Sequence, residues 1–543
     1  MGRLGRLVLG AFAAVLVAAP AAHARDAIVE SFDGTPIVTH FFPAPGAGAG
    51  ATAPTIMIGH GWGLTGATSP PEHYASAGYN VLTWDARGFG GSGGTVMIDH
   101  PEFEARDAQA LIDFIAQQPE ALLDDAGDPR VGMDGPSYGG GIQFITAARD
   151  PRVDAIAPTI AWNSLPTSLY KSNSLKLGWD TALAGLGIPM SLLPGVLSPA
   201  GIQLGHQSPQ FYDLVVSGVS TGRLSASGVG WLAEHGPAQM LPQLNAPTLI
   251  AQGTVDTLFT LDEADRNFRA LKAQGVPVKM VWFCGGHGAC LTGTDAPDPI
   301  SGIAGDSGRV LERKLQWFAR YLKGDATVGT GPEFEWIDEA GAWHESGAYP
   351  LNRTGTISGS GSGTIPLTPG TAGSGFLIFA TPSLVSVDIP IEKPPVGADV
   401  VGEPRLELTY RATGASLAAD GKTHIYAQLI DQQRNLVVGN QATPIPIELD
   451  GASHTLVVPL ERIASLGTAA GYKLQLIPQT TLYDLQRAVG AVQVETATIE
   501  LPLAEPVTVG SEQNAQPGGT AGPAADKQTK TKKKKKKRKK KRR

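Results

Sequence analysis

Ser137 lies in the segment GPSYGG (135–140), which has the glycine–any–serine–any–glycine form of a nucleophile elbow. In such an elbow a strand enters a tight turn, the serine stands at its apex, and a helix leaves. The preceding segment RVGMD (130–134) has the apolar pattern of a short buried strand, and GGGIQFITAARD (139–150) has that of a helix. This context predicts that the Ser137 hydroxyl is a nucleophile.

A second segment, GGSGG (90–94), has the same form around Ser92. It follows DARGF and precedes no helix, so we interpret it as a flexible loop. For Ser137 the alternative is a purely structural glycine-rich turn. The acid and the base that follow it in the chain argue against that alternative.

An acid and a base follow two further apolar runs in the order expected for a catalytic triad. APTLIAQG (246–253) reads as a strand and is followed by Asp256, and VPVKMVWF (276–283) reads as a strand and is followed by His287. Serine, acid and histidine in this order, each after a strand, are typical of α/β-hydrolases. His287 would take the proton of Ser137, and Asp256 would orient the imidazole and stabilise its charged form.

Asp262 is a rival for the acid, but it lies inside a helix-start signal. Thr260 and Glu263 have capping-box spacing, which predicts a helix running to about Gly275. We therefore favour Asp256.

Hydrolysis also needs an oxyanion hole, because negative charge develops on the attacked carbonyl oxygen. The backbone N–H of Tyr138, next to the nucleophile, is the first expected donor. The second is the N–H of Trp62, which follows the strand-like run in TIMIGHGWG (55–63). We expect His60 to support this loop by hydrogen bonding. Trp162 and Trp231 are candidates for the substrate pocket, with burial in the core as the alternative.

The pattern of apolar runs divides the chain into segments of different character. Residues 25–325 alternate strands and helices, starting with a hairpin that turns at Asp33-Gly34, and residues 164–240 interrupt this alternation as a helical cap. Residues 326–504 contain short β-rich runs separated by turn residues, which predict a β-sandwich or barrel. Residues 505–543 have the composition of a disordered tail.

The two ends of the chain bear on localisation and partners. Residues 1–24 resemble a secretory signal, with Ala22-His23-Ala24 as the cleavage site, and an uncleaved membrane anchor is the alternative. The last 17 residues, Lys527–Arg543, hold 14 of the 43 Lys and Arg and no acid, whereas the whole chain has a net charge of −7. The body is thus acidic and would repel nucleic acid, so we expect none as a physiological partner. The tail could bind an anionic envelope polymer or lipid surface, or could merely aid solubility.

Cys284 and Cys290, the two cysteines of the chain, flank His287. In an exported protein an even count favours a disulfide, and the small residues between them allow the loop to close. Two free thiols or a metal site with His287 are the alternatives, but zinc would want about four ligands and no second cluster lies nearby. We expect neither a metal nor a cofactor.

Taken together, the segments DARGFGGSGG and GPSYGG with Asp256, His287 and a C-terminal β-rich region resemble the Xaa-Pro dipeptidyl-peptidase-like and cocaine-esterase-like serine hydrolases. The hairpin FDGTPIVTHFF (32–42) and the segment WIDEAGAWHESGAYP (336–350), expected to open the second domain, carry the same resemblance. It implies an α/β-hydrolase sheet with a helical cap, followed by a jelly-roll-like β-sandwich. Many relatives place a tyrosine side chain in the oxyanion hole after the strand that here ends in His60-Gly61-Trp62. No tyrosine stands there, so backbone donors are expected.

Three functions remain open. The first is a secreted serine hydrolase cleaving an ester or a peptide bond, including an Xaa-Pro dipeptidyl bond. The second is a lipase-like esterase for long acyl chains, favoured if the Leu-rich residues 182–204 form an apolar tunnel. The third is a non-catalytic protein bound to the cell envelope through its tail, which an intact triad argues against.

Overall fold

A computed structural model describes most of the chain between the two termini. Within the described residues no helix is both long and apolar enough to cross a membrane. The tail Lys527–Arg543 and all but the last residue of the expected signal, 1–24, lie outside them. The described residues are 24–48, 50–192, 206–294, 305, 308–370, 373–418, 420–505 and 508–509.

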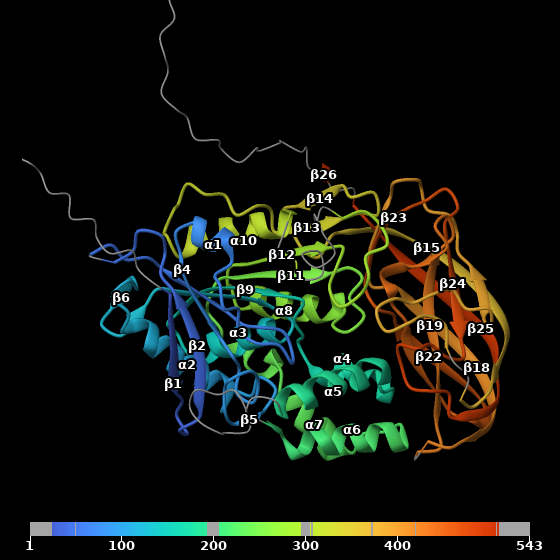
Figure 1. Cartoon of the computed structure of the whole chain (residues 1–543). Coiled ribbons are helices and arrows are strands. Elements are labelled where there is room, and N and C mark those ends of the chain that lie inside the picture. Colours follow the sequence, from blue (N-terminus) through green and yellow to red (C-terminus); the bar gives the residue numbers. More distant parts are fainter. Residues whose placement is uncertain are drawn as a thin grey trace, which may run out of the picture. The chain divides into compact units, whose positions relative to one another are not determined.

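A mixed sheet forms the centre of the first domain (Figure 1). Its strands from β4 to β13 run parallel, whereas the strands at both edges are antiparallel to their neighbours. The parallel strands are almost wholly buried, as expected for a sheet covered on both faces. In spatial order the strands are β1 (Arg25–Glu30), β2 (Pro36–Phe42), β4 (Asn80–Trp84), β3 (Thr55–Ile58), β8 (Val131–Pro136), β9 (Val153–Thr159), β11 (Thr248–Gly253), β12 (Val278–Phe283), β13 (Phe334–Ile337), β14 (Trp343–Ser346) and β26 (Thr508–Val509).

Helices cover both faces of this sheet. Helices α2 (Glu104–Ala116), α3 (Tyr138–Arg149) and α8 (Leu261–Ala273) share one hydrophobic core with it. Helices α1 (Glu72–Ser76) and α10 (Gly308–Tyr321) pack in a second core on the other face. The two groups are separated by the sheet in Figure 1. Because the helices pack on the two faces of the sheet, the side chains at the ends of the strands belong to loops.

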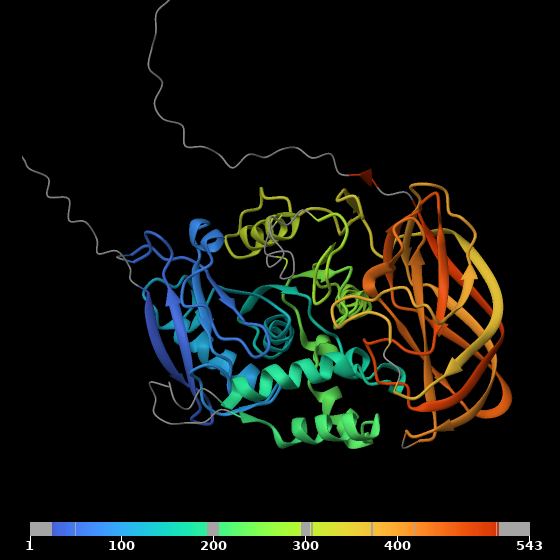
Figure 2. The same cartoon turned by 45° about the vertical axis from the view of Figure 1, so that its right-hand side comes forward.

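The cap predicted for residues 164–240 contains a group of short helices that lie together in Figure 2. It is joined to the first domain by a two-residue parallel pairing of β10 (His206–Gln207) with β5 (Thr95–Val96). Residues 193–205, within the Leu-rich stretch, lie outside the described part. The cap elements are α4 (Leu165–Leu169), η1 (Lys171–Asn173), α5 (Leu177–Leu192), α6 (Pro209–Thr221), α7 (Ala226–Glu234) and η3 (Pro237–Gln239), with η4 (Leu241–Gln243) following.

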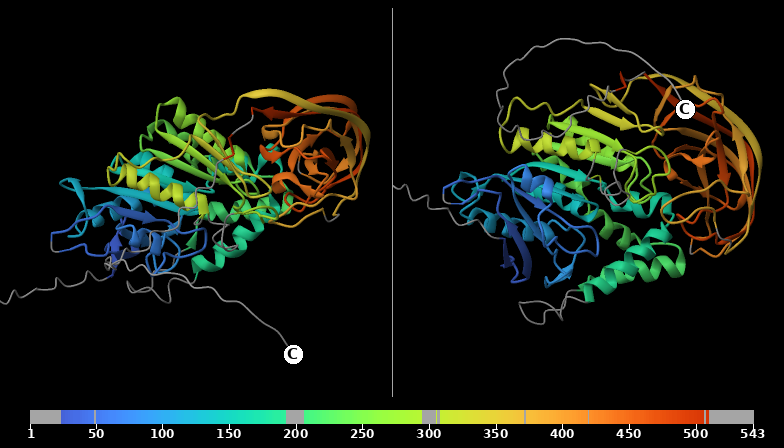
Figure 3. Two further views of the ribbon diagram at one scale, coloured as in Figure 1. Left: turned by 90° about the horizontal axis from the view of Figure 1, so that it is seen from above. Right: turned by 45° about the horizontal axis from the view of Figure 1, so that its top comes forward.

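The second domain consists of antiparallel sheets that share one apolar core, seen from two sides in Figure 3. One sheet has the order β15 (Arg353–Leu367), β25 (Ala488–Ala504), β18 (Arg405–Ser416) and β22 (Asp450–Pro459). The other has β16 (Val387–Pro390), β24 (Tyr472–Ile477), β19 (Thr423–Asp431) and β20 (Leu436–Val437), with β21 (Thr443–Ile447) also on β19. The short pair β17 (Asp399–Gly402) and β23 (Ile463–Leu466) stands apart, as does the first domain's pair β6 (Leu123–Asp125) and β7 (Asp128–Pro129). The predicted fold class, an α/β sheet followed by a β-sheet domain, is confirmed.

Two segments lie elsewhere than the sequence predicted. The central sheet continues past residue 325, because β13 and β14, expected in the second domain, pair in it next to β12. Strand β26 lies within the expected tail from residue 505 and pairs with β14. Short β-rich runs have the same sequence pattern in either sheet, so their partners could not be inferred locally.

Candidate active site

The predicted nucleophile elbow is present. Ser137 stands between β8 and α3 with φ 58°, a left-handed conformation that is unusual for a residue with a side chain. Gly135 and Gly139 approach Gly59 so closely that a Cβ on either would lie 2.4 or 2.1 Å from the Gly59 carbonyl oxygen. The two glycines are therefore required by space as well as by the turn, and they leave Ser137 at the end of the strand.

The structure brings Ser137, His287 and Asp256 together. The His287 Nε2 atom lies 2.9 Å from Ser137 Oγ, and its Nδ1 atom lies 2.8 Å from Asp256 Oδ2. Asp256 is fully buried, and its Oδ1 accepts hydrogen bonds from the backbone N–H groups of Leu258 and Phe259 at 2.9 and 2.8 Å. Each of the three residues follows a parallel strand, so the strand ends position them at one edge of the sheet.

Asp262, the rival acid, points elsewhere. It lies in the first turn of α8, 3.0 Å from Arg462 in the second domain. The predicted capping box is not formed: the Thr260 hydroxyl donates to Glu461 of the second domain at 2.8 Å, and Glu263 accepts from the backbone N–H of Ser164 at the start of the cap. The Thr260 and Glu263 side chains therefore bind distant partners in the second domain and the cap, and do not cap the helix locally.

The two residues expected to supply the oxyanion donors, Tyr138 and Trp62, line the same cavity as Ser137. Tyr138 begins α3, where backbone N–H groups have no acceptor within the helix, and the Trp62 and Tyr138 rings are 5.4 Å apart. Neither backbone N–H donates to a backbone acceptor among the described residues. As expected, His60 supports the adjoining loop: its Nδ1 donates to the Gly61 oxygen at 2.8 Å and its Nε2 accepts from the Ala86 N–H at 2.9 Å.

The segment around Ser92 is not the flexible loop that its glycines suggested. Ser92 is fully buried, donates to the Asp85 carbonyl at 2.6 Å and accepts from the Val38 N–H at 2.8 Å. The neighbouring Arg87 is buried and pairs with Asp107 at 2.6 Å. The loop is thus held rigidly by buried polar contacts, and its hydroxyl is used for structure.

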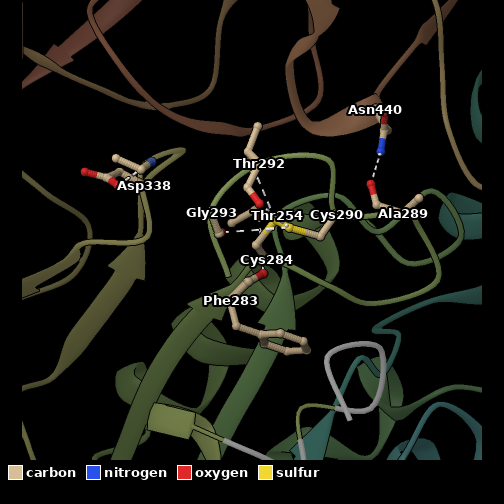
Figure 4. The surroundings of a disulfide bond; sticks show 10 residues. Thr254, Phe283, Cys284, Ala289, Cys290, Thr292, Gly293, Asp338 and Asn440 are labelled. Atoms are coloured by element: carbon tan, nitrogen blue, oxygen red, sulfur yellow. Dashed lines mark hydrogen bonds between the residues drawn. A yellow bond between two sulfur atoms is a disulfide. The ribbon is translucent and has the colours of Figure 1, made fainter. Parts of the chain in front are cut away.

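A disulfide closes the loop that carries His287. The structure joins Cys284 to Cys290, as the sequence predicted, with 5.5 Å between their Cα atoms (Figure 4). Cys284 follows β12 directly, so the link ties the far end of the loop back to the sheet. Among the described residues no group of three His, Cys, Asp or Glu side chains could hold a metal ion.

An apolar cavity of about 860 Å³, including its open mouth, lies over Ser137 between the cap and the sheet. Trp162 lines it, with its indole N–H donating to the His235 carbonyl at 2.9 Å. Trp231 is not among the lining residues; its ring packs 4.0 Å from that of His235 instead. The lining from the cap is almost entirely aliphatic or aromatic, including Leu165, Leu169, Leu175, Leu183, Phe211, Leu214 and Leu224.

Asp180 is the exception in this cavity, and the sequence analysis did not single it out. It lies on α5, lines the cavity with Ser137, and its buried Oδ2 has no hydrogen-bond partner within the described part of the chain. Burial raises the pKa of the Asp180 carboxyl well above its usual range, although the nearby Lys176 opposes this shift. An unsatisfied acid in an apolar cavity is costly and is typical of functional sites. The neighbouring residues Trp179 and Leu183 on the same helix did not indicate that the Asp180 side chain faces the cavity.

A second buried acid, Glu104, lies next to the elbow residue Tyr138. The Tyr138 hydroxyl lies 3.4 Å from Glu104 Oε1, and the two carboxylate oxygens accept from the N–H groups of Met97 and His100 at 2.6 and 2.9 Å. Burial raises the pKa of Glu104 to about 7, while the nearby Arg87 lowers it. The residue that supplies the first oxyanion donor is therefore supported by a group that can change charge near neutral pH.

Comparison with known proteins agrees with this geometry. Residues 33–191 match the family model of X-Pro dipeptidyl-peptidases (S15 family). A 31.7 kDa protein of Escherichia coli from the traX-finO intergenic region is 32% identical over 112 residues, which are 20% of this chain and 37% of that protein. The matched region thus spans well under half of that relative.

Solved structures resemble the chain over most of its length. A CocE/NonD family hydrolase from Staphylococcus aureus has a TM-score of 0.61 at 14% identity, covering 88% of this chain and 93% of that chain. An α-amino acid ester hydrolase gives 0.60 at 13% identity, with 92% and 98% covered. An aminopeptidase from a marine sediment archaeon, Thaumarchaeota archaeon, gives 0.59 at 15% identity, with 90% and 96% covered. At these identities the likeness shows the fold.

The fold and the strand–turn–helix elbow around Ser137 are typical of serine hydrolases of the α/β-hydrolase class. Residues 33–191 thus match the model of the S15 family of X-Pro dipeptidyl-peptidases, and the fold resembles that of a CocE/NonD family hydrolase. The resemblance seen in the sequence is confirmed.

Proposed function

We propose that this protein hydrolyses its substrate through a covalent acyl-enzyme formed on Ser137. The observation that carries this proposal is the continuous hydrogen-bonded chain from Ser137 through His287 to the buried Asp256 at the floor of an apolar cavity. No metal or organic cofactor is needed for such a reaction.

The chemistry follows from the positions of the atoms. His287 Nε2 takes the proton of Ser137 Oγ as this oxygen attacks the acyl carbon, while Asp256 stabilises the imidazolium. The backbone N–H groups of Tyr138 and Trp62 stabilise the oxyanion. His287 then gives the proton to the leaving group, and a water molecule activated by the same histidine releases the acid and restores Ser137.

The cavity supports a more specific proposal for the substrate. Its aliphatic and aromatic lining fits an apolar acyl group, because burying such a group is favourable by roughly 25 cal/mol per Å². Asp180 adds one acidic group. We propose that its carboxylate accepts a hydrogen bond from an amino group on the acyl part of the substrate. The structural neighbours named as an aminopeptidase and as an α-amino acid ester hydrolase support this substrate class. The second candidate is an unsubstituted longer acyl chain, which the apolar lining alone favours.

Labelling of Ser137 tests the nucleophile. A fluorophosphonate probe should label the wild type and leave Ser137→Ala unlabelled, with turnover reduced by roughly 10⁶-fold. Ser92→Ala is the matched control, because that serine has the same local motif but a structural role. Persistent labelling of Ser137→Ala would remove the basis of the proposal.

A substrate panel tests the role of Asp180. Nitrophenyl esters of leucine, N-acetyl-leucine, hexanoate and a longer fatty acid should be compared with a proline-containing dipeptidyl anilide. In Asp180→Asn we expect kcat/KM for the leucine ester to fall by about 10- to 100-fold, the value of one hydrogen bond to a charged group, with the fatty esters little changed. Asp213→Asn, at an exposed cap position, is the control. A preference for the longest fatty ester that Asp180→Asn leaves unaltered would select the second candidate.

We also propose that the protein is exported by residues 1–24 and held at an anionic envelope surface by Lys527–Arg543. Fourteen basic residues near an anionic membrane would contribute roughly 1 kcal/mol each, and salt would screen them over about 8–10 Å. Cell fractionation at low and high salt, with a variant lacking residues 527–543, tests this. Equal retention of the truncated and full-length proteins would exclude the tether.

A further inference from the structure

The second domain contacts the backbone of both loops that carry the acid and the base. The Gln441 Nε2 donates to the carbonyl oxygen of Asp256 at 2.6 Å. The neighbouring Asn440 Nδ2 donates to the carbonyl oxygen of Ala289, two residues after His287, at 3.0 Å (Figure 4). Both amide side chains are buried, with exposed fractions of 7% and 5%. Adjacent residues of one domain therefore hold two loops of the other.

A second segment of the same domain completes the contact. The backbone N–H of Ala289 donates to the Ile378 carbonyl at 2.7 Å, so residue 289 is bonded through both its N–H and its carbonyl. The hydroxyl of Thr257, next to Asp256, lies 2.9 Å from the Leu377 carbonyl and 3.2 Å from that of His287. The acid loop and the histidine loop are thus joined to each other and to the second domain.

The backbone that presents these amides is in an uncommon conformation. In the short turn η5 (Val438–Asn440), Gly439 has φ 65° and Asn440 has φ 56°, two successive left-handed residues. A Cβ at Gly439 would lie 3.0 Å from the Thr254 carbonyl oxygen at the start of the acid loop. Strained backbone of this kind persists only where its surroundings impose it, and it is common at functional sites.

The contacts of Gln441 also matter for the orientation of the acid. Asp256 already has both carboxylate oxygens engaged, one by His287 and one by the N–H groups of Leu258 and Phe259. Its backbone N–H donates to the Gly253 carbonyl at 3.4 Å, and its carbonyl oxygen accepts the shorter hydrogen bond from Gln441. With the carbonyl fixed, rotation of the Asp256 peptide would break a buried hydrogen bond, which is costly.

We propose that Gln441 and Asn440 are positioning residues for the triad, so that the second domain completes the active site instead of only packing against it. This inference rests on the proposed roles of Ser137, His287 and Asp256. It assigns to the β-sheet domain a part in turnover through two named hydrogen bonds. Neither residue touches the substrate.

Two variants remove these bonds with little other change. Gln441→Leu keeps a side chain of similar size and removes the donor to Asp256. Asn440→Gly removes the donor to Ala289 and suits the left-handed backbone, whereas alanine there would add strain. The matched control is Gln428→Leu, because Gln428 is 1% exposed and donates at 3.1 Å to the Thr381 carbonyl within the second domain.

Steady-state kinetics on a small nitrophenyl ester, with the full chain, give the readout. We expect kcat to fall roughly 10- to 100-fold in Gln441→Leu and less in Asn440→Gly, with KM little changed, because misplacement of the triad affects the chemical step. Gln428→Leu should lower thermal stability without altering kcat or KM.

The outcomes separate this inference from the proposed function. If the fluorophosphonate fails to label wild-type Ser137, the proposed function fails. If the wild type is labelled but both variants turn over with the wild-type kcat, or if KM changes in place of kcat, the positioning role is refuted. An equal loss of kcat in Gln428→Leu would also refute it, because the effect would then be a general one of destabilising the domain.

Discussion

Glu104 makes the stability of the protein depend on pH in a direction that can be calculated. Burial raises the pKa of the Glu104 carboxyl from its ordinary value of 4.5 to about 7 in the folded state. The folded protein therefore holds this proton more tightly than the unfolded chain. The contribution to stability is fully present below about pH 4.5 and is lost as the pH rises to about 7 and beyond. The difference between the two pKa values corresponds to about 3 kcal/mol of stability.

Urea unfolding at pH 4.5 and pH 8, followed by tryptophan fluorescence, measures this term. In Glu104→Gln the change in the free energy of unfolding between the two pH values should be about 3 kcal/mol smaller than in the wild type. Glu102→Gln is the control, because the Glu102 side chain is 54% exposed beside Arg149. Because each protein is compared with itself at the two pH values, any pH-independent cost of replacing the carboxyl by an amide cancels. If Glu104→Gln and wild type show the same pH dependence, or if the variant is the steeper of the two, the reasoning about burial is wrong.

Two further substitutions test the elbow and the histidine loop. Gly139→Ala should abolish turnover and destabilise the fold, because its Cβ would lie 2.1 Å from the Gly59 carbonyl oxygen; a thermal melt and an ester assay check this, and wild-type behaviour would contradict the close approach. Replacing both cysteines by serine should lower the free energy of unfolding by about 2 kcal/mol, the chain-entropy value for so short a loop, and should reduce kcat more than it changes KM. Non-reducing peptide mapping that finds two free thiols in the purified protein would remove the premise.

The three residues of the proposed triad could be predicted from the sequence because each of them follows a strand that is recognisable by itself. The parallel sheet then brings Ser137, Asp256 and His287 to one edge without any further information. The cavity wall could not be read in this way. Trp162 lines the cavity and Trp231 does not, yet both are apolar residues in or next to the cap, and only the packing of the cap on the sheet distinguishes them. Asp180 was missed for the same reason, since an acid on a cap helix is more often solvated.

The remaining errors share one physical cause, which is competition between local motifs and distant partners. Thr260 and Glu263 have the spacing of a capping box, but a carboxylate 201 residues away accepts the Thr260 hydroxyl hydrogen bond. Helix α8 forms without the side-chain cap, because its apolar face is buried against the sheet. The Glu263 N–H, which a capping box would bond to the Thr260 hydroxyl, donates to the Thr260 carbonyl at 3.0 Å instead. The same domain supplies Gln441 to Asp256, 185 residues away. Sequence patterns therefore located the proposed reacting groups. The contacts that fix their orientation come from the second domain, whose sequence pattern predicts its strands but not these contacts.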